Sequence, residues 1–100
     1  MKPTGFEWDE GNSGKNAKKH RVSDRECEEV FFDVRFKVFY DRGHSVAENR
    51  YYGLGSTFAK RNLFVVFTVR GDKIRVISTR PMNRKERLEY EKEDEENTEV

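Results

Sequence analysis

The residues of this chain that could do chemistry are two histidines, one loop glutamate and a set of arginines. His20, His44 and Glu48 can each accept or donate a proton. Arginine keeps its charge and offers a planar fork that contacts two phosphate oxygens at once. These residue types suit cleavage of an RNA phosphodiester without a metal, in which a base activates the ribose 2′-hydroxyl, an acid protonates the leaving oxygen and cations hold the phosphate.

Each of these residues also has an interpretation without chemistry. A lone histidine in a polar segment usually faces solvent, and this applies to both His44 and His20. Glu48 and Arg50 are two residues apart, so on a strand they share a face and could form a surface ion pair. Arg80 differs, because we expect it at the end of an apolar strand on the core face, where a guanidinium needs a partner.

Other kinds of chemistry lack their motifs. Cys27 is the only cysteine, and the two histidines show no ligand spacing such as C-x-x-C or H-E-x-x-H, so we predict neither a metal site nor a cofactor. No phosphate-binding loop, dinucleotide fingerprint or nucleophile elbow is present, and Gly53-Leu54-Gly55 is too short to count as one.

Length and charge give a single domain with a basic body. One hundred residues predict one domain over 1–90, followed by an acidic tail over 91–100 that we expect to be disordered. Residues 1–88 hold 19 Lys and Arg against 12 Asp and Glu, a difference of +7, whereas residues 89–100 hold one against seven, a difference of −6. A basic body favours a polyanionic partner such as nucleic acid. Since no signal peptide or membrane span is recognisable, we expect a cytoplasmic chain.

The elements that must position these residues begin with two helices. A short helix is predicted to end in Lys18, Lys19 and His20, where cations complement the helix dipole. A capping box of Ser23 and Glu26 opens a second helix that runs to about Phe32.

Four antiparallel strands and a last helix follow. Alternation predicts a strand over 36–40, and a second over 48–58 with a bulge at its paired glycines. The segment 63–69 turns through Gly71-Asp72 and returns over 74–80 as a hairpin. Asn83 caps a helix that reaches Tyr90.

In the hairpin we expect a core face and a basic face. Val69 should lie opposite Ile74, and Phe67 opposite Val76. The basic face then carries Thr68, Arg70, Lys73 and Arg75. Under this register, Arg75 and Arg80 point to opposite faces.

Taken together, these residues resemble the BrnT family of ribonuclease toxins from BrnT/BrnA toxin–antitoxin pairs, which have a RelE-like fold. The resemblance spans nearly the whole chain and rests on Phe6-x-Trp8-Asp9, Asn16, Lys19-His20, Val22-Ser23-x-x-Glu26, Asp41, His44-Ser45, Glu48-x-Arg50, Gly55, Leu63-x-Val65-Val66-x-Thr68, Arg75-Val76-Ile77-Ser78-x-Arg80, Glu86 and Tyr90. Departures include Asn12 where the family has Lys, Arg21 in place of Gly and Asp24 in place of an aromatic residue, and Thr79-Pro81-Met82 also differs.

The resemblance implies an α+β, RelE-like fold with two amino-terminal helices, a four-stranded antiparallel sheet and a carboxyl-terminal helix. It implies an RNA-cleaving toxin that inhibits translation and is neutralised by a BrnA-like antitoxin, which also binds operator DNA.

Our predicted roles combine the resemblance with the register. Arg50, Arg75 and Arg80 hold the scissile phosphate, and His44 or Glu48 transfers the proton. Further RNA contacts are predicted for Lys18, Lys19, His20, Arg70 and Lys73. The alternative is a degenerate toxin that binds RNA or protein through the same basic face and cleaves nothing.

Overall fold

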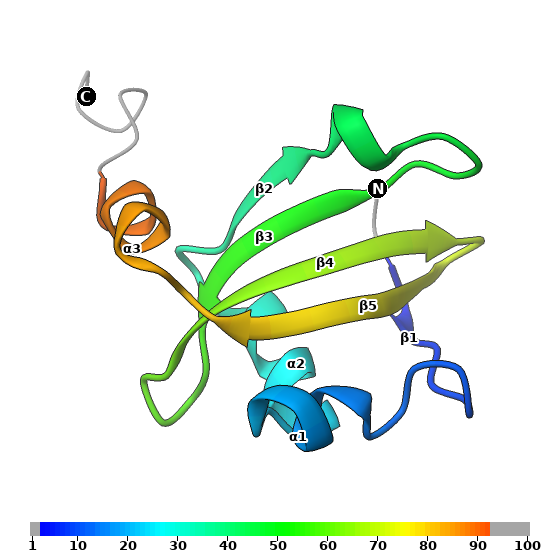
Figure 1. The fold of residues 1–100 in the computed structure, drawn as a ribbon, viewed down its shortest axis with the longest axis horizontal. Coiled ribbons are helices and arrows are strands. Elements are labelled where there is room, and N and C mark those ends of the chain that lie inside the picture. Colours follow the sequence, from blue (N-terminus) through cyan, green and yellow to red (C-terminus); the bar gives the residue numbers. More distant parts are fainter. Residues whose placement is uncertain (1–2, 93–100) are drawn as a thin grey trace.

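A computed structural model of the chain describes residues 3–92 and contains three α-helices and a mixed sheet (Figure 1). The elements, in chain order, are β1 (Gly5–Phe6), α1 (Lys15–His20), α2 (Asp24–Glu29), the 3₁₀ turn η1 (Val30–Phe32), β2 (Lys37–Tyr40), the 3₁₀ turn η2 (Arg42–His44), β3 (Tyr51–Ser56), β4 (Asn62–Arg70), β5 (Lys73–Pro81) and α3 (Arg84–Glu91). The expected acidic tail lies outside the described residues from position 93 on. No helix within residues 3–92 is long and apolar enough to cross a membrane.

The sheet has five strands in the order β1-β5-β4-β3-β2, so the expectation of four strands was wrong. The four predicted strands are antiparallel neighbours, and the extra strand β1 pairs in parallel with the start of β5. Because β1 has only two residues, Gly5 and Phe6, it is too short to show an alternating pattern. Its place at the edge is decided by contact with a strand nearly seventy positions later.

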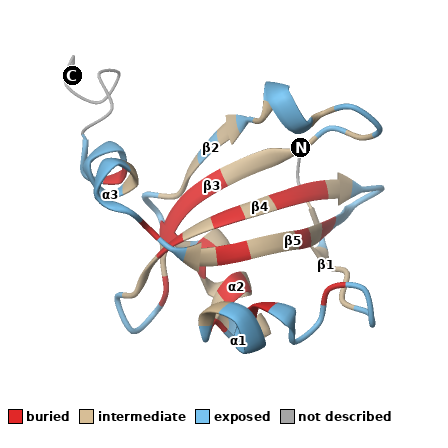
Figure 2. Cartoon of the chain, in the orientation of Figure 1, coloured by how far each residue is buried: buried red, intermediate tan, exposed pale blue. Residues whose placement is uncertain are grey.

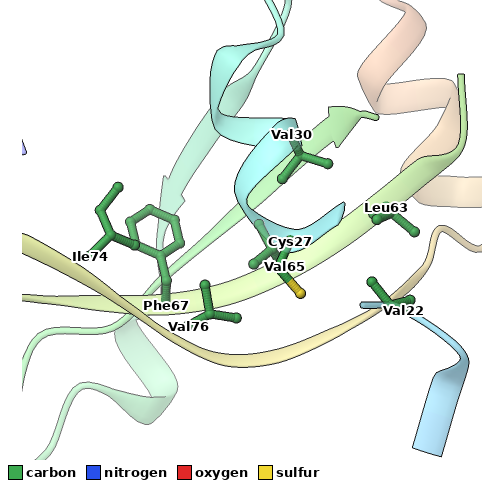
Figure 3. Packing of buried hydrophobic residues seen from close by; sticks show 8 residues of the cluster. All are labelled: Val22, Cys27, Val30, Leu63, Val65, Phe67, Ile74 and Val76. Atoms are coloured by element: carbon green, nitrogen blue, oxygen red, sulfur yellow. The ribbon is translucent and has the colours of Figure 1, made fainter. Parts of the chain in front are cut away.

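Helices α1 and α2 cover one face of the sheet and form the core with it (Figure 1). Figure 3 shows side chains from the helical segment pointing toward apolar side chains of β4 and β5. This core cluster of buried side chains, all labelled in Figure 3, consists of Val22, Cys27, Val30, Leu63, Val65, Phe67, Ile74 and Val76. The predicted capping box of Ser23 and Glu26 is present and fixes the start of α2 above this core.

The paired glycines of β3 do not form a bulge, because β3 pairs continuously with both neighbours from Tyr51 to Leu54. They are required by close packing instead. A Cβ on Gly53 would overlap the Phe36 ring, and one on Gly55 would come within 2.9 Å of the Val30 side chain. Glycine therefore lets the segment before β2 pack directly on the strand.

The hairpin of β4 and β5 has the predicted register near its turn and a bulge farther along. Phe67 faces Val76 and Val69 faces Ile74, as expected, and Gly71 in the turn has a φ of 62°. The register then shifts between Val66 and Phe67, so that Val66 faces Ser78 and Ile77 is the extra residue.

This bulge corrects the predicted side of Arg80. Thr79, and not Arg80, points into the core and is fully buried, facing Val65. Arg80 faces Phe64 on the opposite side of the sheet, which is also the side of Arg75 and its partner Thr68. Arg75 and Arg80 therefore lie on the same face of the sheet, whereas a register without the bulge would place them on opposite faces.

Candidate active site on the open face of the sheet

The face of the sheet opposite α1 and α2, called the open face below, carries the functional candidates of β3, β4 and β5. By the strand register it includes Phe39, Tyr52, Leu54, Phe64, Val66, Thr68, Arg70, Arg75, Ser78 and Arg80. Figure 2 shows that buried residues follow the strands, whereas the turn after β4 and the surface of α3 are exposed. The open face thus has two ends, one at the β4–β5 turn and one at α3 (Figure 1).

At the turn end, five charged side chains form one ion-pair network. Arg75 lies 2.9 Å from Glu7 and 2.9 Å from Asp9, both in the segment after β1. Arg70 lies 3.5 Å from the same Glu7 and 3.5 Å from Glu48. The network brings together three of the predicted site residues, Glu48, Arg70 and Arg75.

Arg75 is the inner member of this network. Its side chain is 12% exposed, whereas those of Glu7 and Asp9 are 36% and 55% exposed. The hydrogen bonds from Arg75, followed by that from the Gly11 amide, hold the pKa of Asp9 below its usual value. The hydrogen bonds that Arg75 donates to these carboxylates, those to Asp9 first, raise the pKa of the Arg75 guanidinium. This part of the network therefore presents carboxylates to solvent over a fixed cation.

Asn12 builds the loop that carries these carboxylates. It is 4% exposed, donates to the carbonyls of Glu7 and Val76, and accepts a hydrogen bond from the Asp9 amide. Asn12 stands where the resemblance leads us to expect Lys, and its role here is structural. Sequence reasoning missed this role because the Val76 carbonyl is 64 positions away.

The loop between β2 and β3 brings the remaining candidates to the same end. The Ser45 hydroxyl accepts from the Arg50 amide, and Thr68 of β4 donates to the Asn49 carbonyl at 2.6 Å, which ties the loop to the sheet. Within residues 3–92 no carboxylate lies at ion-pair distance from Arg50, which immediately precedes β3. Its charge is therefore available to a ligand.

His44 lies in η2 of the same loop and is 73% exposed. Its Nδ1 faces the Asp41 carboxylate at 2.9 Å, which leaves Nε2 directed away from this partner. A histidine held through Nδ1 by a carboxylate is oriented for proton transfer at Nε2.

At the α3 end of the open face, Arg80 forms a second cluster. Its two terminal nitrogens donate to the two oxygens of Glu86, each at 2.8 Å, and its guanidinium carbon lies 4.2 Å from the centre of the Phe64 ring. Glu86 also accepts from the Asn83 amide and completes the predicted cap of α3. Burial raises the pKa of Glu86, but the hydrogen bonds from Arg80 and Asn83 outweigh it, so that the pKa is lowered.

The β4 partners of the two β5 arginines, Thr68 and Phe64, are four positions apart, which is roughly 13 Å along a strand. They therefore belong to separate places on the open face. Lys18, Lys19 and His20 form the last turn of α1, on the covered side of the sheet, and Lys73 lies beside the hairpin turn near Thr4.

The buried thiol of Cys27 lies under β5 and is not activated. Burial raises its pKa to about 11, and its sulfur contacts the Thr79 hydroxyl at 3.2 Å and the amide of Asn16. A thiol with a raised pKa is a poor nucleophile. Within residues 3–92, no group of three His, Cys, Asp or Glu side chains is arranged to hold a metal ion.

A basic α+β domain with arginines and a glutamate at one end of an open sheet face is suited to binding and cleaving nucleic acid. Comparison with protein families matches residues 8–86 to the ribonuclease toxin BrnT of type II toxin–antitoxin systems. The chain therefore belongs to the BrnT family, whose members are ribonuclease toxins with an antitoxin partner. A comparison with curated proteins gave no match.

Proposed function

We propose that this protein is a metal-independent endoribonuclease that cleaves RNA at the turn end of the open face and thereby inhibits translation. The observation that carries the proposal is the ion-pair network that joins Glu48 and Arg70 to Arg75, at the end of the sheet where Thr68 holds the loop that leads into Arg50. Attack of a ribose 2′-hydroxyl on the adjacent phosphate needs a proton acceptor for the hydroxyl and cations for the phosphate, and both kinds of group are present at this end.

In this mechanism the arginines hold the phosphate as its negative charge increases. Arg50 contributes a charge with no carboxylate partner among residues 3–92, and Arg70 is half exposed with two loose partners at 3.5 Å. Arg75 acts mainly through its fixed contacts with Glu7 and Asp9, which set the shape and charge of the site. Arg80 binds a more distant part of the same RNA.

Proton transfer is assigned to Glu48 or His44. Glu48 is one-third exposed and lies 3.5 Å from Arg70, while His44 is oriented by Asp41. Either group can take the 2′-hydroxyl proton when the substrate lies across the loop of residues 41–50, and the other can give a proton to the 5′-oxygen as its bond to phosphorus breaks.

The test is cleavage of RNA by purified protein in the presence of a chelator. Arg50→Ala, and either Glu48→Gln or His44→Gln, should each lower the cleavage rate about 10²–10³-fold with an unchanged unfolding transition. Arg25→Ala is the matched control, because Arg25 is 85% exposed on α2 at the covered side. Cleavage that needs a divalent metal, or that survives the Arg50 substitution, would contradict the proposal.

A second candidate function is RNA or protein binding without cleavage. The ion pairing of both β5 arginines favours it, since Arg75 and Arg80 are each held by carboxylates of the same chain. Intact RNA that is shifted in a gel and never fragmented would support this alternative.

The partner implied by the family is an antitoxin, and we extend this to a BrnA-like protein that also binds operator DNA, in the cytoplasm. Co-expression of the reading frame beside the toxin gene should suppress growth arrest. Growth arrest that persists in the presence of that product would contradict the assignment of the partner.

A further inference from the structure

The α3 end of the open face contains a row of stacked aromatic rings. Phe39 of β2 stacks on Tyr52 of β3 with ring centres 5.0 Å apart and planes 20° apart. Tyr52 stacks on Phe64 of β4 at 5.5 Å and 29°. The Arg80 guanidinium over Phe64 extends the row to β5. We call Phe39, Tyr52 and Phe64 the aromatic row.

The aromatic row lies beside an open groove and is only partly covered. α3 forms the other wall of this groove, which has a volume of about 500 Å³ and is lined by Phe39, Tyr52, Leu54, Phe64, Asn83, Lys85, Glu86, Leu88, Glu89 and Lys92. Leu54, Met82 and Tyr90 are buried and hold α3 to the sheet, whereas the three rings are half-buried and Leu88 is 60% exposed. The small core between α3 and the sheet therefore leaves part of the aromatic row exposed.

The charges around the groove favour an anion with flat, apolar parts. Among residues 3–92, Lys85, Lys92 and Arg80 are the cations at the groove and the aromatic row, and Glu86 and Glu89 are the carboxylates, which leaves one cation in excess (3 − 2 = 1). Glu86 already has both oxygens on Arg80 and the Asn83 amide, so it is the less available of the two acids.

We propose that this groove is a subsite for single-stranded RNA, in which unpaired bases contact the aromatic row and phosphates meet Lys85, Lys92 and Arg80. Aromatic side chains on an open sheet face with neighbouring cations bind unpaired bases in other proteins, with little demand on sequence. The assignment rests on the proposed ribonuclease function, because by the strand register the aromatic row and the network of Arg70 and Arg75 lie on one face of the sheet. One strand of RNA can then be held at α3 and cut near the turn.

The neighbouring residues supply a matched control. Tyr40 and Tyr51 adjoin Phe39 and Tyr52 in sequence, and by the strand register they point to the other face. We compare Phe39→Leu/Tyr52→Leu with Tyr40→Leu/Tyr51→Leu, and Phe39→Leu alone with Tyr40→Leu alone in case a double variant unfolds. Thermal unfolding establishes that each variant used is folded.

The probe is a labelled single-stranded 2′-O-methyl RNA of about 12 nucleotides, within the range of known single-strand sites. It lacks a free 2′-hydroxyl, so binding is measured without cleavage. Substitutions in the aromatic row should weaken binding about 10-fold, the size expected when a base loses its aromatic contact, and the controls should not.

Equal affinity of the test and control variants would overturn the subsite and leave the groove to a protein partner. Failure of the wild-type protein to bind the single strand would overturn it as well. Binding that depends on the aromatic row in a protein that never cleaves unmodified RNA would support the subsite and contradict the ribonuclease function, so the two proposals can fail separately.

Discussion

The two arginines of β5 are held in opposite ways. At the turn end the cation is inside, because the Arg75 side chain is 12% exposed beneath carboxylates that are 36% and 55% exposed. At the α3 end the acid is inside, because Glu86 is 17% exposed and Arg80 is 35% exposed. At the turn end the carboxylates are thus the more exposed partners of the ion pairs, and at the α3 end the guanidinium is the more exposed partner.

This difference gives the two arginines different roles: one shapes a site and the other is available to bind a ligand. A guanidinium under two acids is fixed and largely neutralised, so Arg75 is better suited to hold the loop of Glu7 and Asp9 than to meet a phosphate. Arg80 keeps one face on an aromatic ring and its edge near solvent, which suits contact with a nucleic acid. Arg50, which has no carboxylate partner among residues 3–92, adds a binding charge at the turn end.

The largest expected effect concerns the bulge that places both arginines on one face. Asn16 is buried, and its side-chain oxygen accepts a hydrogen bond from the Thr79 amide at 2.9 Å. Thr79 lies two positions after the extra residue of the bulge. Asn16→Ala leaves that buried amide without a partner and should lower the free energy of unfolding by ~1–3 kcal/mol. Chemical denaturation measures this change.

Lys18→Ala on the same helix is the control for Asn16→Ala, since Lys18 is exposed and its removal should change stability by less than about 0.5 kcal/mol. Equal effects of the two substitutions would mean that the Asn16 contact does not support the bulge.

A smaller effect concerns the inner acid of the α3 end. Glu86→Gln weakens both the Arg80 pair and the cap of α3, and should cost about 1 kcal/mol at neutral pH. Because the pKa of Glu86 is lowered on folding, its contribution is present above the unfolded value of 4.5 and is lost as pH falls through the folded value. Denaturation of both proteins across pH 2–7 measures the difference, which should shrink in acid.

Glu91→Gln is the control for this pH series, because Glu91 is exposed at the end of α3. A difference between wild type and Glu86→Gln that stays constant down to the lowest pH would show that the carboxylate charge is not responsible.

The smallest effect concerns the outer acids of the turn end. Asp9→Asn removes the most exposed carboxylate on Arg75 and should raise RNA affinity a few-fold. It should also steepen the dependence of log affinity on log salt by up to about one, as expected when one more cation meets phosphate. Filter binding or fluorescence anisotropy at several salt concentrations measures both quantities.

Glu10→Gln makes the same change of net charge in the same loop, where Glu10 has no ion-pair partner among residues 3–92. If it raises affinity as much as Asp9→Asn, the effect is one of overall charge and not of releasing Arg75.

The sequence by itself determined the local features. The capping boxes at Ser23 and Asn83 and the pairing of Phe67 with Val76 follow from spacing within a few residues of a cap or turn, and all three are confirmed. Composition also indicated a basic domain, and the pattern as a whole indicated the family that the comparison confirms.

Only the tertiary structure decided which faces the functional residues share. The parallel strand β1, the buried role of Asn12 and the contact of Asn16 with Thr79 depend on residues more than sixty positions apart. An alternating sequence pattern does not reveal the extra residue Ile77, because the bulge is stabilised by these distant partners. One extra residue in a strand reverses the face of every side chain that follows it. That reversal moves Arg80 from the core to the open face.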